Sequence, residues 1–422
     1  HKDRGVIILD SQDSMLDYPS LFRWPFDLKN INSQISWTIS DQLISLELNH
    51  LTLDATDVQL LADGLFDIHR HSGVIDMNVY AELENGNVAK TRNFLPNAIM
   101  GDNLVNYLDN SIKSGTLTAA QISIRGPATH FPFSNTEGVF AINAQVADTL
   151  FVFTQGWPEI NKISADLWFV ENSMDIHLTK GSSNGQNISQ ASAIIENFSS
   201  KPPMLLIKTA TTGLAEDGID YIFNSPLKNT IGKIFDIIPA TGPFALELDI
   251  SMPLANKVDV KVDGLVQLKG NSILVKPVDM AITNIQGDIN ISDSLIAAKN
   301  LSAELMAGNS HFSLQQQRDA EGLLLTTILG NGIVSTTGVR TVFPDWIPKA
   351  LEGETEYNLK LLLPETDTAQ FDAEKIMDLS VDSNLRGIVS PFPAPFNKTT
   401  EQLESFHLNH KILENNQHLY SI

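Results

Sequence analysis

Residues 242–254 read GPFALELDISMPL, and this stretch shows how the chain folds. From Phe244 to Met252 every second residue is large and apolar, and the residues between them are small, polar or acidic. Side chains of a strand point alternately to opposite faces, so the segment predicts a strand with one apolar and one polar face. The apolar face has to be covered, either by another part of the chain or by a ligand.

The same alternation recurs along the chain, in strand-like segments separated by Gly, Asn, Asp and Pro. Two architectures explain it. The apolar faces can close into β-sandwich cores, which is the commoner arrangement. Alternatively, they can line the open concave face of a long curved sheet, and an exposed apolar stripe of that length has to be occupied by a ligand. The candidate lining residues are Phe140, Ile142, Val146, Leu246, Leu248, Ile250, Leu359 and Leu361.

Composition excludes several classes of protein. The 422 residues include 28 basic and 50 acidic side chains, a net charge of −22, which argues against nucleic-acid binding. Cysteine is absent, so disulfides, thiolate catalysis and zinc ribbons are excluded. No apolar run is long enough for a membrane-spanning helix. Because the chain starts with His1 and no signal segment follows, we expect it to be part of a longer protein.

Helical periodicity is confined to three short segments. The apolar spacing predicts amphipathic helices over residues 226–238, 96–112 and 344–351. Each of them leads into a strand through a glycine, and these glycines are Gly115, Gly242 and Gly353, about 110 to 130 residues apart. The pattern I-x-x-x-[IL]-x-[WFI] recurs at a similar interval, starting at Ile31, Ile163 and Ile285.

Two independent markers with similar periods predict diverged repeats of a mostly β unit that carries one helix. We therefore expect four segments: a partial repeat over 1–95, repeats over 96–225 and 226–340, and the start of a further repeat over 341–422.

No motif requires an enzyme. The run from Gly181 to Gly185 matches G-x-S-x-G, but the hydrolase motif needs a helix directly after the serine, and a strand-like segment follows here. His69 and His71, with Asp67, suggest a metal face, although histidines beside a turn explain them more simply. The acidic pair at 216–217 is typical of a helix N-terminus rather than a calcium loop. We expect no catalytic residue, metal or cofactor.

Several motifs, in their order along the chain, resemble the central region of YhdP-type proteins of the AsmA-like group. They are Phe94-Leu95-Pro96, Gly115 at the start of a strand that ends in Arg125-Gly126, Phe131-Pro132-Phe133, Gly156-Trp157-Pro158, and NLRGIVSPFPAPFNK with Leu385, Gly387, Pro393, Pro395 and Lys398. The family's usual Asp before that leucine is Asn384 here. The resemblance covers about residues 25–410.

This resemblance implies a mainly β fold: an elongated, strongly curved antiparallel sheet of repeating β-groove units with a few short amphipathic helices. It also implies a Gram-negative envelope protein in the periplasm, tethered to the inner membrane by an N-terminal helix absent from this chain. The expected function is transport of phospholipid between inner and outer membranes along an apolar groove, which supports lipid homeostasis of the outer membrane. The expected partners are phospholipid and the two membranes or their proteins, without nucleic acid. The alternative is a non-enzymatic scaffold or adhesin of tandem closed β-sandwiches.

Overall fold

Strands make up most of the protein, as the alternating sequence predicts. Hydrogen bonds join 22 of them into one antiparallel sheet. The chain divides into two compact units, His1–Thr211 with Asp249–Val260 and Thr212–Leu248 with Lys261–Ile422. The computed structural model describes residues 3–19, 22, 24–90, 93, 102–133, 137–229, 235, 239–254, 260–276, 279–292, 295–318, 324–345, 347–364, 377–413 and 417–421.

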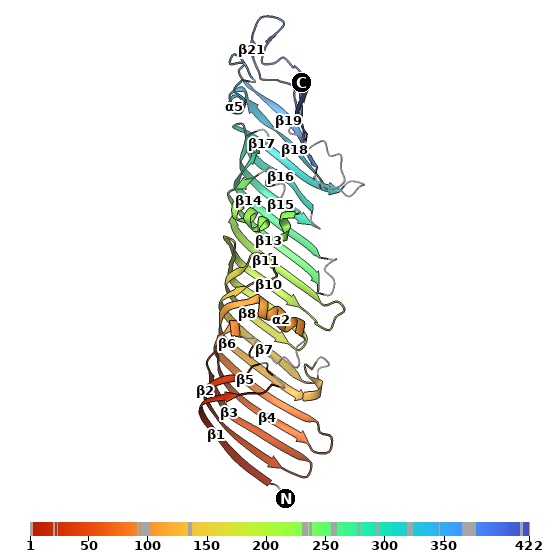
Figure 1. The fold of residues 1–422 in the computed structure, drawn as a ribbon. Helices are drawn as coiled ribbons and strands as arrows, with labels where there is room; N and C mark the ends of the chain where they lie inside the picture. The colour runs from red at the N-terminus through yellow and green to blue at the C-terminus, as the bar shows by residue number, and fades with distance from the viewer. Residues whose placement is uncertain are drawn as a thin grey trace. The chain divides into compact units, whose positions relative to one another are not determined.

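The first unit is an antiparallel meander. From β1 to β10 each strand pairs with the next one in sequence, so that sequence neighbours lie side by side (Figure 1). These strands are β1 (Asp3–Leu16), β2 (Phe26–Ile39), β3 (Leu43–Ala55), β4 (Gln59–His69), β5 (Ile75–Asn87), β6 (Ile112–Pro127), β7 (Val139–Phe151), β8 (Ile160–Val170), β9 (Ser173–Ser183) and β10 (Gln186–Ile195).

The second unit repeats this arrangement. Strands β14 to β20 pair in sequence order, β20 pairs with β23, and β23 with β24. The bounds are β12 (Ala240–Thr241), β14 (Lys261–Val275), β15 (Met280–Ser292), β16 (Leu295–Leu305), β17 (Gly308–Arg318), β18 (Leu324–Ser335), β19 (Glu354–Pro364), β20 (Met377–Ser383), β23 (Phe406–Ile412) and β24 (His418–Ser421). Strands β11 (Met204–Leu214) and β13 (Pro243–Pro253) contribute residues to both units.

Within the described residues the sheet has no second sheet packed on it. The remaining strands, β21 (Ser390–Pro391) and β22 (Asn397–Lys398), form only a two-stranded hairpin. A β-sandwich needs two sheets packed face to face, so the alternative of tandem closed sandwiches is wrong. Most described residues of the strands are half-buried or exposed rather than buried.

Fully buried side chains gather in small clusters inside each unit. In the first unit Leu28, Ala55 and Val58 pack together. The second unit has two clusters, one around Ile285, Ala298, Leu301, Ala303, Leu305, Phe312 and Tyr357, and one of Leu363, Met377 and Ile412. Residues between these clusters are mostly half-buried, as expected of one layer of strands.

β-Bulges interrupt the strands at matching places. Register shifts occur between Leu48 and Leu51 of β3, and likewise in β7, β8, β14 and β15. At these shifts His50, Asp148, Lys162, Gly270 and Asn284 have positive φ. A bulge bends its strand and increases the local twist. We therefore expect each of these strands to bend at the bulge residue that has a positive φ.

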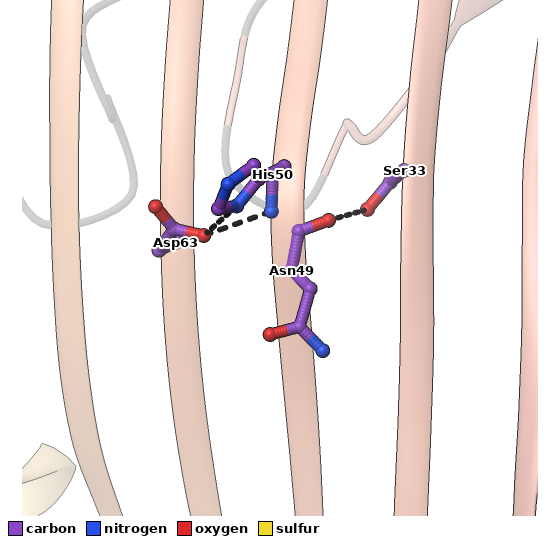
Figure 2. Close-up of polar contacts among 4 residues, drawn as sticks. All are labelled: Ser33, Asn49, His50 and Asp63. Carbon is purple, nitrogen blue, oxygen red and sulfur yellow. Dashed lines mark hydrogen bonds and ion pairs between the residues drawn. The ribbon is translucent and has the colours of Figure 1, made fainter.

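Two side chains hold the β3 bulge, as Figure 2 shows. Asp63 of β4 accepts hydrogen bonds from the backbone N–H of His50 at 2.8 Å and contacts its Nδ1 at 3.0 Å. On the other side, the buried Ser33 hydroxyl of β2 donates to the carbonyl of Asn49 at 3.3 Å. The backbone groups that the bulge frees from the ladder are thereby satisfied.

The helices agree only in part with the expectations. The helix expected over 96–112 is present as α2 (Asp102–Ser111), and residues 96–101 of the expected segment lie outside the described residues. Helix α3 (Ala215–Phe223) begins at the acidic pair that predicted a helix N-terminus. Of the helix expected over 226–238, only η3 (Pro226–Asn229) and the helical Phe235 are described. The described residues also include two short 3₁₀ turns, η1 (Val88–Lys90) and η2 (Ala128–His130).

The prediction of a helix over residues 344–351 is wrong. The described residues of that segment form turns, and the helix lies upstream as α5 (Thr336–Val342). Pro344 and Pro348 lack the N–H group that a helix interior requires. Ser335 instead starts the helix, because its hydroxyl accepts the N–H of Gly338 at 3.0 Å.

Helices α2, α3 and α5 each precede a glycine with a positive φ, a conformation that residues with a side chain rarely adopt. The φ angles of Gly115, Gly242 and Gly353 are 141°, 103° and 115°. A Cβ atom at these positions would approach Thr149 Cα to 2.8 Å, Asn271 Cα to 3.0 Å and Gly387 O to 2.1 Å, respectively. Each glycine thus lets its strand approach a later segment closely. The division into four segments that rests on these glycines stays a proposal.

Candidate functional site

Strand pairing in the first unit lines up apolar side chains in continuous rows. Directly paired residues share a face of the sheet, so the register defines each row. One row consists of Leu53, Leu60, Leu83, Ala120, Ala144, Leu167, Ile176 and Ala193, and runs from β3 to β10. Its neighbour consists of Leu51, Ala62, Ala81, Ile122, Ile142, Phe169, Met174 and Ile195. We call this the apolar face.

Three of the predicted lining residues lie on this face. Ile142 belongs to the second row, Phe140 pairs with Ile124, and Val146 pairs with Leu117 and Ala165. All three are half-buried rather than buried. The register therefore brings them together on one side of β7, where each is partly exposed.

The second unit shows the same organisation. One row contains Ala298, Leu314, Ile328, Leu361 and Leu379, and another contains Leu301, Phe312, Gly330, Leu359, Val381 and Leu408. The predicted residues Leu359 and Leu361 are thus members of adjacent rows, and both are half-buried. The rows named in both units contain no Asp, Glu, Lys or Arg, although the chain has 78 such residues.

Strand β13, the opening segment, also has one apolar side. Leu246, Leu248 and Ile250 are half-buried, whereas Glu247 and Asp249 are exposed. In the second unit the Leu248 side chain lies over Gly264, because a Cβ there would be 2.6 Å from Leu248 Cδ2. Gly264 pairs with Ile291, so Leu248 shares the apolar face of β14 and β15. Ile250 and Asp249 belong to the first unit.

On the opposite face of the sheet, which we call the polar face, charged and polar side chains lie among a smaller number of apolar ones. In the first unit the row beside those above reads Thr52, Leu61, Glu82, Gln121, Asn143, Trp168, Asp175 and Ile194. Exposed pairs such as His69 with Asp76 at 2.9 Å lie on this polar face. Hydrogen bonds from His50, first from its backbone N–H, hold the pKa of Asp63 below its usual value. Such exposed pairs contribute little to stability.

The two best-defined depressions among the described residues lie away from the predicted lining residues. Two shallow depressions of about 330 and 350 Å³ are lined mainly by polar residues, among them Asp13 and Lys29 in one and Arg386 and Glu401 in the other. Neither includes a predicted lining residue.

The G-x-S-x-G run is a β-hairpin. Ser183 ends β9, Asn184 and Gly185 turn with positive φ, and β10 follows at once. The Ser183 hydroxyl is buried and donates to the carbonyl of Glu159 at 2.9 Å. A nucleophile at a strand-to-helix turn is thus absent from this segment.

His69 and His71 do not form a metal face. His69 ends β4 and contacts Asp76, whereas His71 lies in the following turn. Across the part of the chain that the structure describes, no group of three or more His, Cys, Asp or Glu side chains could hold a metal ion.

Polar side chains on the apolar face were not predicted from the sequence. Ser310 and Tyr357 bond to each other at 2.7 Å in the interior of the second unit. Burial raises the pKa of Tyr357, and the bond to Ser310 opposes that shift. His410 pairs with Leu379 and so continues an apolar row. Alternation within each strand predicts that these residues lie on the apolar face. Only the register between strands shows which residues are their neighbours.

None of the described helices has the length and apolar character needed to cross a bilayer. The family model of the YhdP protein matches residues 1–422. The chain belongs to the YhdP family. The intermembrane phospholipid transporter YhdP of Escherichia coli (strain K12) is 21% identical to it over 397 residues, which is 94% of this chain and 30% of that protein. No solved structure matches the chain.

Membership of the YhdP family confirms the resemblance seen in the sequence. The chain spans about 30% of the length of its Escherichia coli relative, so the activity of a whole YhdP protein comes to this chain only as a proposal. The mainly β sheet with its few short helices is confirmed by the structure.

Proposed function

We propose that this chain is a periplasmic segment of an inner-membrane-anchored YhdP-family protein that carries phospholipid between the inner and outer membranes. Its apolar face is the transport surface, and the acyl chains lie on the rows of β3 to β10 and β16 to β23. The anchoring helix would belong to a part of the protein outside this chain. The role needs no catalytic residue.

One observation carries this proposal: rows of apolar side chains, most of them half-buried and the rest buried, cross many strands without a charged residue. Exposing an acyl chain to water costs about 0.8 kcal/mol for each CH₂ group. A surface of constant low polarity removes most of that cost at every step along it. The name of the Escherichia coli relative, an intermembrane phospholipid transporter, supports the choice of phospholipid.

A scaffold or adhesin explains the face less well. Its apolar side chains would be expected to close against protein, and within the described residues no second sheet does so. A large open apolar surface otherwise favours aggregation, so an amphiphilic occupant accounts for both the sequence and the sheet.

The test is to extract lipid from protein purified without detergent and to identify it by mass spectrometry. We expect phospholipid in the wild-type protein. The variants Ile142→Arg and Leu361→Arg should lose most of it but stay folded, because an arginine on an open face can extend its charged end to water. The matched controls Asn143→Arg and Asn358→Arg, on the polar face, should keep it.

Folded wild-type protein that repeatedly yields no lipid would contradict the proposal. Equal loss of bound lipid in the apolar-face and polar-face variants would also contradict it, because lipid binding would then not depend on the apolar face.

A further inference from the structure

Three neighbouring strands inside the first unit carry carboxylates but no lysine or arginine. Strands β3, β4 and β5 lie side by side (Figure 1), between β2, which contains Lys29, and β6, which contains Arg125. Their two histidines, His50 and His69, each contact a carboxylate. The acidic residues of the three strands all take polar-face positions: Glu47, Asp54, Asp63, Asp67, Asp76, Glu82 and Glu84. We call this part of the polar face the acidic surface.

Three exposed apolar side chains lie in the middle of the acidic surface. Leu61 and Leu65 of β4 are 41% and 39% exposed, and Tyr80 of β5 is 41% exposed. Tyr80 pairs with Asp63, which lies between the two leucines on the same face of β4. The three are therefore diagonal neighbours around one carboxylate. Single exposed leucines are common on protein surfaces, whereas this group offers apolar area that a partner can cover together with its charges.

Each of these apolar side chains has a carboxylate directly beside it on the next strand. The pairs are Leu61 with Glu82, Leu65 with Glu47, and Tyr80 with Asp63. Lysine and arginine match such a pair, because an apolar stem can pack on the leucine or tyrosine while the charged end reaches the carboxylate. Arginine can also stack on a tyrosine ring and bond a carboxylate through two N–H groups.

The carboxylates of the three pairs still have an oxygen to offer. Glu82 Oε1 accepts from the Tyr80 hydroxyl at 2.6 Å, and Glu47 Oε2 accepts from the Ser36 hydroxyl at 3.1 Å. Asp63 uses Oδ1 at the β3 bulge. Each of these contacts involves one carboxylate oxygen, whereas an ionised carboxylate accepts hydrogen bonds at both. A bound cation therefore does not have to break them.

The spacing of the pairs indicates the shape of the partner. Leu61, Asp63 and Leu65 are successive residues on one face of β4, so the three pairs follow one another at about 7 Å along the strand. Side chains at every second position of an extended segment repeat at the same distance. The turns of a helix repeat at about 5.4 Å and would be out of step by the third pair.

We propose that the acidic surface binds an extended segment of a second protein that carries Arg or Lys at every second residue. Charge complementarity selects this partner, since the chain has a net charge of −22 and the three strands contribute no Lys or Arg. The same carboxylates repel nucleic acids and anionic membranes. This role goes beyond lipid transport and uses the opposite face of the sheet, so both faces can be occupied at once.

The experiment measures binding of a fluorescent peptide in which Arg and Thr alternate to the 422-residue chain, by fluorescence anisotropy. A second peptide has the same composition with its arginines consecutive, and a third alternates Glu and Thr. We expect the alternating Arg peptide to bind about tenfold more tightly than the consecutive one, and the Glu peptide not to bind. Raising the salt from about 50 to about 300 mM should weaken binding, because exposed charges are screened.

Matched variants separate the pairs from general charge. Leu65→Ser and Tyr80→Ser keep every carboxylate, yet each should weaken binding of the alternating peptide about tenfold, because the arginine stem loses its apolar contact. Leu329→Ser and Asp288→Asn alter exposed polar-face residues of the second unit and should bind as the wild type does. All four positions are exposed or half-buried at the surface, so thermal unfolding should be unchanged.

Several results would overturn the acidic surface as a docking site. They are absence of binding to the wild type, equal affinity for the two Arg peptides, and equal weakening by Leu65→Ser and Leu329→Ser, which would mean that charge alone holds the peptide. A photo-crosslinking group on the alternating peptide checks the place in wild-type protein, independently of any variant. Adducts on β3, β4 and β5 would support the proposal, and adducts mainly on other strands would refute it. Either result leaves lipid binding by the apolar face to its own test.

Discussion

Two leucines on one strand show how the apolar face differs from a closed core. Leu363 is buried with Met377 and Ile412, whereas Leu361, two residues earlier on the same face of β19, is only half-buried. Burial rather than residue type sets the cost of removing a side chain. The pair therefore distinguishes the packed part of the face from the open part.

We expect Leu363→Ala to lower the free energy of unfolding by about 2–5 kcal/mol, because it leaves a cavity. Leu361→Ala should cost about half as much or less, since part of that side chain already contacts water. Denaturant unfolding of lipid-free protein measures both. Equal losses would mean that Leu361 is covered by protein and that the face is closed there.

Gly353 is a residue whose missing side chain matters. Its φ of 115° and the 2.1 Å approach of a Cβ to the Gly387 carbonyl combine backbone strain with a steric clash. We expect Gly353→Ala to destabilise the second unit by more than about 2 kcal/mol. Gly156→Ala is the control, because its φ is 85° but nothing lies near its Cβ position; it should cost about 1 kcal/mol. Thermal unfolding compares the two, and similar losses would contradict the close approach.

At the scale of elements, the bulges decide how each strand bends, and side chains hold them. The β3 bulge depends on Asp63 being ionised, since its carboxylate accepts from the His50 backbone and contacts the ring. A depressed carboxyl pKa adds stability above the unfolded value, about 3.8, and this stability is lost as the pH falls through the lower folded value.

Asp63→Asn should therefore flatten the fall in stability between pH 5 and pH 3 relative to the wild type. The size should be well under about 1 kcal/mol because the pair is exposed. Urea unfolding at both pH values measures the difference, with Asp54→Asn as a control carboxylate on β3. An unchanged slope in Asp63→Asn would show that the carboxylate does not bind the bulge in solution.

The sequence predicts strands more reliably than it predicts where helices and bulges lie. The alternation from Phe244 to Met252 predicts on which face of the strand each side chain lies, because side chains of a strand repeat with a period of two. The helix at Thr336–Val342 was misplaced because β-branched residues and Gly338 hide it, and the Ser335 cap is its main signal. Bulges such as the one at His50 leave no apolar pattern, since each inserts a single residue whose conformation is fixed by partners on other strands.

The same limit applies to the candidate site. The lining residues Phe140, Ile142, Leu359 and Leu361 follow from alternation alone. The register places Ile142, Leu359 and Leu361 in the named rows and pairs Phe140 with Ile124. The contact of His410 with His418 and Tyr420 could not be predicted, because it depends on the pairing of β23 with β24. Alternation predicts the face of a residue, whereas the register decides its neighbours.

At the scale of the whole molecule, each unit presents an apolar face that its own described elements leave partly open. Because the apolar face continues across many strands, a ligand that covers it must itself be apolar over that length. Photo-crosslinking residues on adjacent positions of one strand sample the two faces while everything else stays constant, since neighbours on a strand point in opposite directions.

The most direct test places a photo-crosslinking amino acid at Ile142 and Leu361 on the apolar face, and at Asn143 and Lys360 on the polar face, in cells. The account predicts phospholipid adducts, identified by mass spectrometry, at Ile142 and Leu361 and none at Asn143 and Lys360. Absence of adducts at all four positions in folded protein, or equal labelling of both faces, would contradict the claim that phospholipid travels along the apolar face.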